Sequence, residues 1–320
     1  MDDHEAPRPG LQAIREAAAR IAPWIHRTPV VTCAAIDERA GMRLFFKCEN
    51  LQRVGAFKMR GASNAVFSLS DREARRGVAT HSSGNHAQAL ALAARNRGIP
   101  AHIVMPDNAP EVKRAAVAGY GGRIVPCAPT LAARESTLQR VVEQTGAVFV
   151  HPYDDHRIIA GQGTAALELL EQVPDLDAVV APVGGGGLAS GTALAVHGLA
   201  PHVRVLAAEP RNADDAFRSL RDGRIVPSDD PHTVADGLRT SLGARTFPIL
   251  REHLDRIALA GEDGIVAAMR LLWERAKLVV EPSGAVPLAA LLEDPGDLRG
   301  RRIGVLVSGG NVDLDRLPWA

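Results

Sequence analysis

Neither sign of charge predominates in this chain. Lys plus Arg and Asp plus Glu number 37 each, which gives a formal net charge of zero. Long basic or acidic blocks are also lacking. Nucleic acids and anionic membrane surfaces select concentrated positive charge, so the sequence predicts neither as a partner. The expected partner is a small molecule.

Long apolar runs and paired cysteines are scarce as well. No apolar stretch approaches the roughly 20 residues that span a bilayer. The chain begins Met1-Asp2-Asp3-His4-Glu5, which is acidic where a secretory signal is basic, so we expect a cytoplasmic protein. The three cysteines, Cys33, Cys48 and Cys127, lack the spacing of a zinc site, and we expect reduced thiols.

The hydrophobic pattern predicts an α/β protein. Apolar residues recur at helical spacing from Leu11 to Ile21, and Pro23 ends that helix. Short β-rich runs then alternate with Ala- and Leu-rich helical stretches, which is typical of mostly parallel sheets with crossover helices. The expected strands are Leu44–Lys47, Gly77–Thr80, His102–Met105, Arg123–Val125, Ala147–Val150, Ala178–Val183, Val203–Ala207 and Ile303–Val307.

In such sheets, ligands bind beyond the carboxyl ends of the strands. One loop at such an end holds four consecutive glycines, Gly184 to Gly187, followed by a predicted helix, Leu188–His197. Backbone N–H groups and the helix dipole would converge there on an anion, so the loop predicts a phosphate site. Its spacing fits neither a dinucleotide fingerprint nor a P-loop. The alternative is a flexible turn, because glycine clusters are common in loops.

A single lysine, Lys58, lies between Phe57 and Met59 among small residues. If its amine is partly desolvated, its pKa falls and it can condense with an aldehyde. The alternative is a surface lysine whose stem covers Phe57 and Met59. The lysine alone does not decide between the two.

Six motifs, in a fixed order along the chain, favour the reactive lysine, because together they resemble a known family. From about Ile14 to Leu314 the chain resembles the serine/threonine dehydratase and serine racemase family, which are fold-type II enzymes that use pyridoxal 5′-phosphate (PLP). The motifs are Lys47-Cys48-Glu49-Asn50-Leu51-Gln52, Gly55-Ala56-Phe57-Lys58-Met59-Arg60-Gly61-Ala62, Ser82-Ser83-Gly84-Asn85-His86, the tetraglycine loop, Glu281-Pro282-Ser283-Gly284-Ala285 and Ser308-Gly309-Gly310-Asn311.

The resemblance implies two open, mostly parallel sheets with helices on both faces, and a small domain inserted in a large one. Residues 1–65 and 152–320 would form the large PLP-binding domain, and 66–151 a small mobile domain that closes on the substrate. A homodimer is expected from the family.

The resemblance also assigns roles to site residues. Lys58 would bond covalently to the cofactor, Phe57 would flank its ring, and Asn85 would bond its 3′-oxygen. The phosphate would be held by Gly184, Gly185, Gly186, Gly187 and Leu188. The substrate carboxylate would be gripped by Ser82, Ser83, Asn85 and His86.

Ser308 would face the pyridine nitrogen. A neutral hydroxyl there leaves the nitrogen largely unprotonated and the ring a shallow electron sink, which suits prompt β-elimination. The expected reaction converts L-threonine or L-serine to a 2-keto acid and ammonia. Serine racemisation is an alternative, because Ser83, on the opposite face of the ring, could reprotonate Cα.

The family resemblance implies two further ligands. Glu209, the Ala213 carbonyl and Asp215 would bind a divalent cation, for which Mg, Ca and Mn are candidates, and hard oxygen ligands suit all three. Without the resemblance, a solvated acidic turn would be expected. Gln88, Tyr120, Lys277 and Asn311 match positions that bind ATP in eukaryotic serine racemases. Arg53-Val54 replaces the Lys-Thr usual there, which weakens that expectation.

Arg134 bears on the substrate. It matches an arginine in the small domain of the racemases, and at the β-side of a substrate it would favour a threo-3-hydroxyaspartate dehydratase, because a guanidinium pairs bidentately with a carboxylate. The alternative is a helix-surface arginine beside Glu135. Tyr153 looks more like threonine dehydratases than mammalian serine racemases.

Overall fold

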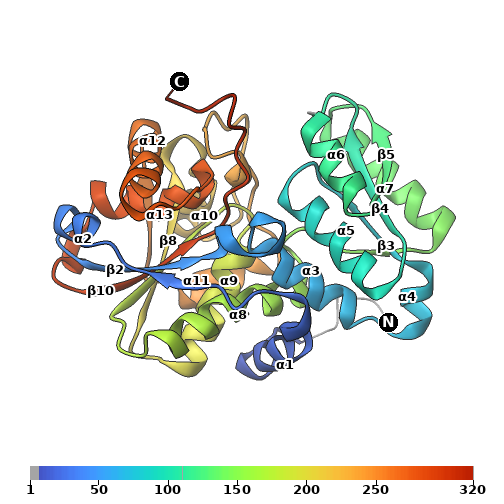
Figure 1. The fold of residues 1–320 in the computed structure, drawn as a ribbon. Helices are drawn as coiled ribbons and strands as arrows, with labels where there is room; N and C mark the ends of the chain where they lie inside the picture. Colours follow the sequence, from blue (N-terminus) through green and yellow to red (C-terminus); the bar gives the residue numbers. More distant parts are fainter. Residues whose placement is uncertain (1–6, 110, 320) are drawn as a thin grey trace.

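The computed structural model describes residues 7–109 and 111–319, and its backbone forms two open sheets with helices on both faces (Figure 1). The larger sheet has six strands in the order β1-β2-β10-β7-β8-β9. All of its neighbouring strands are parallel except the pair β1 and β2. The strands are β1 (Val30–Val31), β2 (Arg43–Cys48), β7 (Ala178–Pro182), β8 (Arg204–Pro210), β9 (Arg256–Ala260) and β10 (Arg302–Val307).

Alternating side chains of these strands enter two separate cores, one on each face of the sheet. Val179 and Ala181 belong to the first core, and Ala178 and Val180 to the second. This period of two is what a strand buried on both faces requires. The first core is covered by α1 (Leu11–Ile21), α8 (His156–Gln172), α9 (Gly187–Leu199), α10 (Asp215–Asp222) and α11 (Thr246–His253). The second is covered by α2 (Ala34–Ala40), α12 (Glu262–Leu271) and α13 (Pro282–Glu293).

The second sheet is wholly parallel and has the order β5-β4-β3-β6. Its strands are β3 (Val78–His81), β4 (Ala101–Pro106), β5 (Arg123–Cys127) and β6 (Val148–Phe149). One face packs on α3 (Lys58–Phe67), α4 (Asp71–Arg76), α5 (Asn85–Arg97) and α6 (Glu111–Gly119). The other face packs on α7 (Leu131–Thr145).

The predicted α/β class and all eight predicted strands are confirmed, and the first helix has the predicted bounds Leu11–Ile21. Two strands were missed. β1 has only two residues, and β9 lies at the edge of the large sheet with one neighbour. A two-residue strand shows no alternation, and β9 is rich in Ala and Leu, which favour helices.

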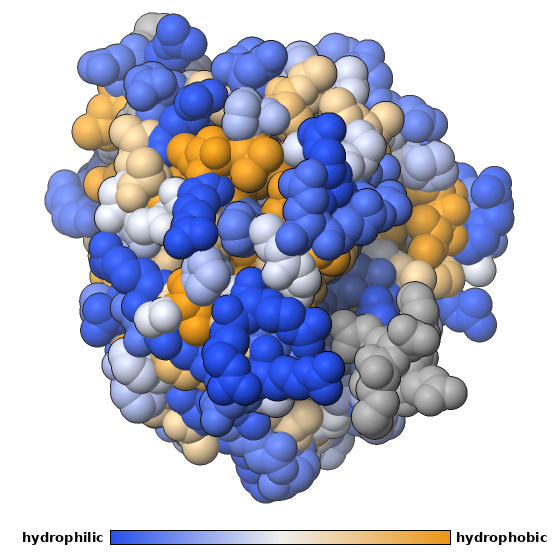
Figure 2. Space-filling model, turned by 90° about the vertical axis from the view of Figure 1, so that its right-hand side faces the viewer, coloured by the Kyte–Doolittle hydropathy of each residue, from blue (hydrophilic) through white to orange (hydrophobic). Residues whose placement is uncertain are grey.

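The face of the molecule on the side of the smaller sheet is mostly hydrophilic, with apolar patches between hydrophilic residues (Figure 2). Within the described residues, no helix is long and apolar enough to cross a membrane. The three cysteines all lie in the described chain and none forms a disulfide there.

A buried ion network fixes α3 to the large sheet. The Arg60 guanidinium donates from Nε and Nη2 to Glu49, at 2.7 and 2.8 Å, and from Nη1 and Nη2 to Glu168, both at 2.8 Å. Lys47 Nζ also donates to Glu168, at 2.7 Å. Arg60, Lys47 and Glu49 are fully buried. Two cations thus balance two anions, so no buried charge is left uncompensated.

We expect Arg60→Met to lower the free energy of unfolding by about 3–5 kcal/mol, because it leaves buried carboxylates without their cation. The control is Arg27→Met, whose exposed pair with Glu171 spans 2.8 Å. That change should cost less than about 1 kcal/mol. Urea unfolding of both variants measures the difference, and equal losses would contradict the account.

Candidate active site

Lys58 is the first residue of α3 and lies beside the loop that follows β10. The preceding segment makes a left-handed turn at Val54 and Gly55, with φ of 56° and 67°. Ala56 then pairs with Gly309 as an antiparallel bridge, and Phe57 N–H donates to Ser308 O at 3.0 Å. The predicted neighbours Phe57, Lys58 and Ser308, which come from opposite ends of the chain, are therefore brought together.

Lys58 is half-buried, and its amine is held by a backbone carbonyl. Nζ donates to Pro152 O at 2.7 Å and lies 5.0 Å from the centroid of the Phe57 ring. Burial lowers the pKa of Lys58 to about 8, against the opposing charge of Glu281. A larger share of this amine is neutral, and hence nucleophilic, than for an exposed lysine.

The other lysines of the chain are differently placed. Lys47 belongs to the buried ion network, Lys113 pairs with Asp236 at 3.3 Å near the surface, and Lys277 is exposed. Lys58 is thus the lysine that combines a lowered pKa with partial exposure, whereas Lys47, whose pKa is also lowered, is fully buried.

The tetraglycine loop lies between β7 and α9, as predicted. Gly186, at φ +89°, caps α9, and Ser190 N–H makes the first helical bond, to Gly186 O at 2.8 Å. The N–H groups of Gly187, Leu188 and Ala189 therefore precede the first helical donor and are available to an anion.

Close neighbours explain why this loop has no side chains. A Cβ on Gly185 would lie 2.4 Å from the Tyr153 ring, and one on Gly186 would lie 2.8 Å from Thr246. Thr246 Oγ1 donates to Gly185 O at 2.9 Å and so fixes the loop from outside. The loop is a buried, supported cradle, and a flexible turn is a poor description of it.

Glu281 is a site residue to which the sequence assigned no role. Asn85 Nδ2 donates to both Glu281 carboxylate oxygens, at 3.0 and 3.2 Å, and Asn85 Oδ1 accepts from Asn311 Nδ2 at 2.8 Å. Burial raises the pKa of Glu281 to about 7. The Glu281-Pro282 motif at the start of α13 was the available signal, but it carried no chemistry by itself.

The loop expected to grip a carboxylate follows β3 and leads into α5. Ser82, Ser83 and Asn85 are half-buried there. His86 is buried, and its Nε2 lies 3.2 Å from Val150 O. Burial holds its pKa well below the usual 6.5, so the ring is neutral and Nε2 carries the proton. Its Nδ1 cannot then donate, so His86 can bind an anion here only through its backbone N–H.

Arg134 lies in the first turn of α7, near the end of β3. Burial lowers the pKa of His81, the last residue of β3. The charge of Glu135 raises that pKa and the charge of Arg134 lowers it, so both side chains of α7 act on the end of β3. The Nε of Arg134 is buried and has no hydrogen-bond partner among the described residues.

Glu209, near the end of β8, and Asp215, the first residue of α10, form a buried acidic pair. Both are fully buried, and Glu209 accepts N–H bonds from Ala216 and Phe217, at 2.8 and 2.9 Å. Neither carboxylate oxygen of Asp215 has a partner among the described residues. Burial raises the pKa of Glu209 to about 9 and that of Asp215 to about 6.

No cluster of three or more His, Cys, Asp or Glu side chains that could hold a metal occurs in the described part of the chain. A cation here would need a backbone ligand, and Ala213 lies in the turn Arg211–Ala213 between the two acids.

The residues matched to a nucleotide site are only partly assembled. Asn311 joins the Glu281 cluster, but no hydrogen bond links Gln88, Tyr120 or Lys277 to one another in the described chain. Lys277 follows a π-helical turn, Leu272–Ala276, and its Nζ donates to Glu274 O at 2.7 Å.

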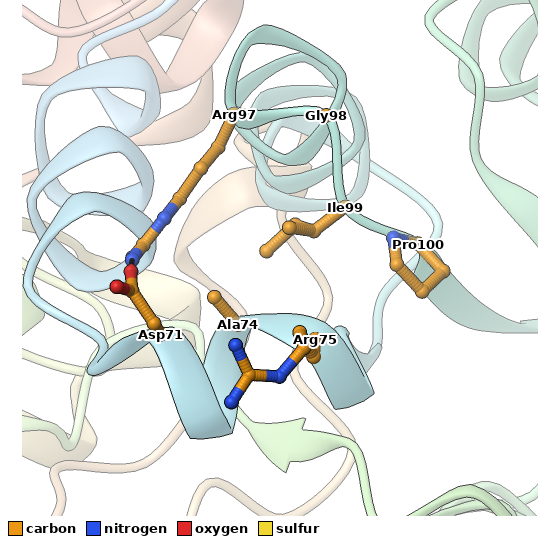
Figure 3. A pocket seen from close by; sticks show the side chains of 7 residues that line it. All are labelled: Asp71, Ala74, Arg75, Arg97, Gly98, Ile99 and Pro100. Atoms are coloured by element: carbon orange, nitrogen blue, oxygen red, sulfur yellow. Dashed lines mark ion pairs between the residues drawn. The ribbon is translucent and has the colours of Figure 1, made fainter.

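A hollow of about 380 Å³ lies elsewhere, between α4 and the segment after α5 (Figure 3). Arg97 points across it to Asp71, with 3.7 Å between Nη2 and Oδ1. Arg97 also donates to Leu69 O at 2.7 Å, so its guanidinium already has partners within the protein. The hollow holds none of the predicted site residues.

Comparison with known proteins decides the family. The model of the family described as pyridoxal-phosphate dependent enzyme matches residues 21–309. The chain belongs to this family. The β-hydroxyaspartate dehydratase of Paracoccus denitrificans is 54% identical over 97% of this chain and 99% of its own length. The serine racemase of Dictyostelium discoideum is 50% identical and covers 96% of both chains.

Solved structures agree with the family. Maize serine racemase has a TM-score of 0.95 at 50% identity, over 97% of this chain and 95% of its own. A bacterial threonine deaminase, from T.th., has a TM-score of 0.91 at 47% identity, over 96% and 99%. The expected fold of this PLP-dependent enzyme is thereby confirmed.

The residues present fit PLP. The partly desolvated Lys58 follows Phe57, which bonds Ser308, and its acceptor Pro152 precedes Tyr153, which packs on the glycine cradle. The lysine suits the aldehyde of PLP, the glycine cradle suits its phosphate, and Ser308 suits its pyridine nitrogen.

Proposed function

We propose that this PLP-dependent enzyme is an ammonia-lyase that removes the β-hydroxyl and ammonia from a small 3-hydroxy-amino acid, leaving a 2-keto acid. The observation that carries the proposal is the Lys58 amine, whose pKa is lowered to about 8 and whose one hydrogen bond among the described residues is to Pro152 O. Such an amine can both attack an aldehyde and, once released, take the proton from Cα.

The chain's own residues bind the cofactor and the substrate and move the protons. The N–H groups at the start of α9 bind the cofactor phosphate, and the backbone of the Ser82–His86 loop binds the substrate carboxylate. When bound, PLP supplies an aldehyde for the substrate amine and a ring that withdraws electrons from Cα. Lys58 then receives the Cα proton and, as the ammonium, donates one to the departing hydroxyl.

Ser83 supports racemisation as a second activity. In this proposal it lies across the ring from Lys58, and a hydroxyl there returns a proton to the face opposite the one that Lys58 serves. The resemblance to serine racemases at 50% identity supports this alternative.

Arg134 favours 3-hydroxyaspartate over L-serine and L-threonine as the preferred substrate. A buried guanidinium nitrogen without a partner among the described residues calls for an anion, and a β-carboxylate would supply one. The relative named β-hydroxyaspartate dehydratase, at 54% identity, supports the same choice.

We further propose a divalent cation at Glu209, Asp215 and the Ala213 carbonyl. Two buried acids, one without any partner in the described chain, are costly unless a cation or protons compensate them. Oxygen ligands of this kind suit Mg²⁺, Ca²⁺ or Mn²⁺.

Three family traits complete the proposal. Residues 66–151 close as a unit over the substrate, the enzyme works as a homodimer, and ATP binds near Asn311. The contact of Asn311 with Asn85 supports the last of these, because it links that place to the active site.

Lys58→Ala should abolish both the absorbance band of bound PLP linked to lysine and the release of 2-keto acid from all three substrates. Lys58→Arg is the matched variant, since it keeps the charge but cannot condense with the aldehyde. Keto acid production by either variant at the rate of the unchanged enzyme would refute the proposal.

Arg134→Gln should lower kcat/KM for threo-3-hydroxyaspartate by about 10- to 100-fold, the value of a hydrogen bond to a charged group. The same change should alter kcat/KM for L-serine by less than about threefold. Arg140→Gln, an exposed residue of the same helix, is the control. An equal loss on both substrates would exclude Arg134 as a β-carboxylate ligand.

Metal-free enzyme should lose stability as pH rises through about 6 and about 9, because the raised pKa values of Asp215 and Glu209 favour the protonated fold. Millimolar Mg²⁺ should raise Tm most at the alkaline end. Asp215→Asn should remove this response, whereas Asp229→Asn, at an exposed position, should keep it. A Mg²⁺ response that survives Asp215→Asn would contradict the site.

A further inference from the structure

Four rings form a continuous row along the carboxyl ends of β3 and β6. The ring centroids of His81 and Phe149 are 6.2 Å apart, those of Phe149 and His151 5.7 Å, and those of His151 and Tyr153 4.5 Å. Tyr153 in turn packs on Gly185 of the phosphate cradle. The row therefore leads from the substrate loop to the cofactor site, and His151 lies in its middle.

His151 adjoins the Lys58 amine. The carbonyl that accepts from Lys58 Nζ belongs to Pro152, the next residue in the chain. The imidazole is half-buried, so part of it stays exposed, and the charge of Lys58 acts on it. A group in this position lies beside the atoms that react with Lys58.

The proton of this imidazole has a fixed place. His151 Nδ1 accepts the backbone N–H of Asp154 at 2.9 Å and that of Tyr153 at 3.3 Å. An atom that accepts two N–H groups carries no hydrogen, so the proton of the neutral ring is on Nε2.

The ring also stays neutral. Burial lowers the pKa of His151 to about 4; Asp154 and Asp155 oppose this shift, while His81 and Lys58 add to it. No acceptor for the Nε2–H of His151 is found among the described residues. His86 differs, because its Nε2 faces Val150 O.

We infer that His151 is a further substrate-binding residue, whose Nε2–H donates to the β-hydroxyl and holds it in line for departure. This inference rests on the proposed elimination. The Cα–H bond breaks to Lys58, its electron pair forms the Cα=Cβ bond, and the Cβ–O bond breaks. The hydroxide leaves as water with a proton from the Lys58 ammonium. His151 keeps its own proton and only orients and stabilises the leaving oxygen.

The test compares two substrates that differ in the leaving group. L-Serine loses hydroxide and needs a donor, whereas β-chloro-L-alanine loses chloride and needs none. His151→Phe removes the donor at similar size, and His151→Gln keeps an acceptor and an N–H donor. The readout on the PLP-loaded enzyme is the ratio of kcat/KM for L-serine to kcat/KM for β-chloro-L-alanine.

His151→Phe should lower this ratio about tenfold, which corresponds to one net hydrogen bond in the transition state. His151→Gln should keep it within about threefold of the unchanged enzyme. An unchanged ratio in His151→Phe, or an equal loss of both activities in the two variants, would overturn the inference. Failure of the unchanged enzyme to release keto acid from threo-3-hydroxyaspartate, L-serine and L-threonine alike would refute the proposed function itself.

Discussion

Two backbone hydrogen bonds hold the segment before Lys58 against the large sheet. Phe57 N–H donates to Ser308 O at 3.0 Å, and Gly310 N–H donates to Gly55 O at 2.9 Å. Through them, the segment before α3 lies along the loop that leaves β10. Lys58 can therefore reach Pro152 O. The same two bonds fix its position relative to Ser308 and the tetraglycine loop. The buried Arg60 network fixes the rest of α3 behind this contact.

The same constraint explains the chemistry. Lys58 enters an environment of carbonyl, aromatic and half-buried groups, where its amine loses solvation and its pKa falls. His151 and His86, in the same surroundings, are kept neutral by burial. The chain thus places a titrating amine near two neutral imidazoles and the Glu281 carboxyl, which is an arrangement suited to moving a proton at that amine.

Local patterns were enough to predict much of this structure. The period of α1, the strands, and the tetraglycine loop leading into a helix all depend on neighbouring residues, and the structure has them in place. Pairings between distant segments could not be read in this way. Arg60 meets Glu168 across 108 positions, and Asn85 meets Glu281 across 196. The tautomers of His86 and His151 were also beyond the sequence, since each depends on backbone groups that folding brings near the ring.

The account depends on Lys58 as the lysine that takes the cofactor, and reduction of the PLP-loaded enzyme with borohydride tests this directly. The reduced bond is permanent, so digestion and mass spectrometry can locate it. We expect the added mass of the cofactor on the peptide that contains Lys58. Its appearance on a peptide with Lys47, Lys113 or Lys277 instead, or on no lysine, would contradict the account.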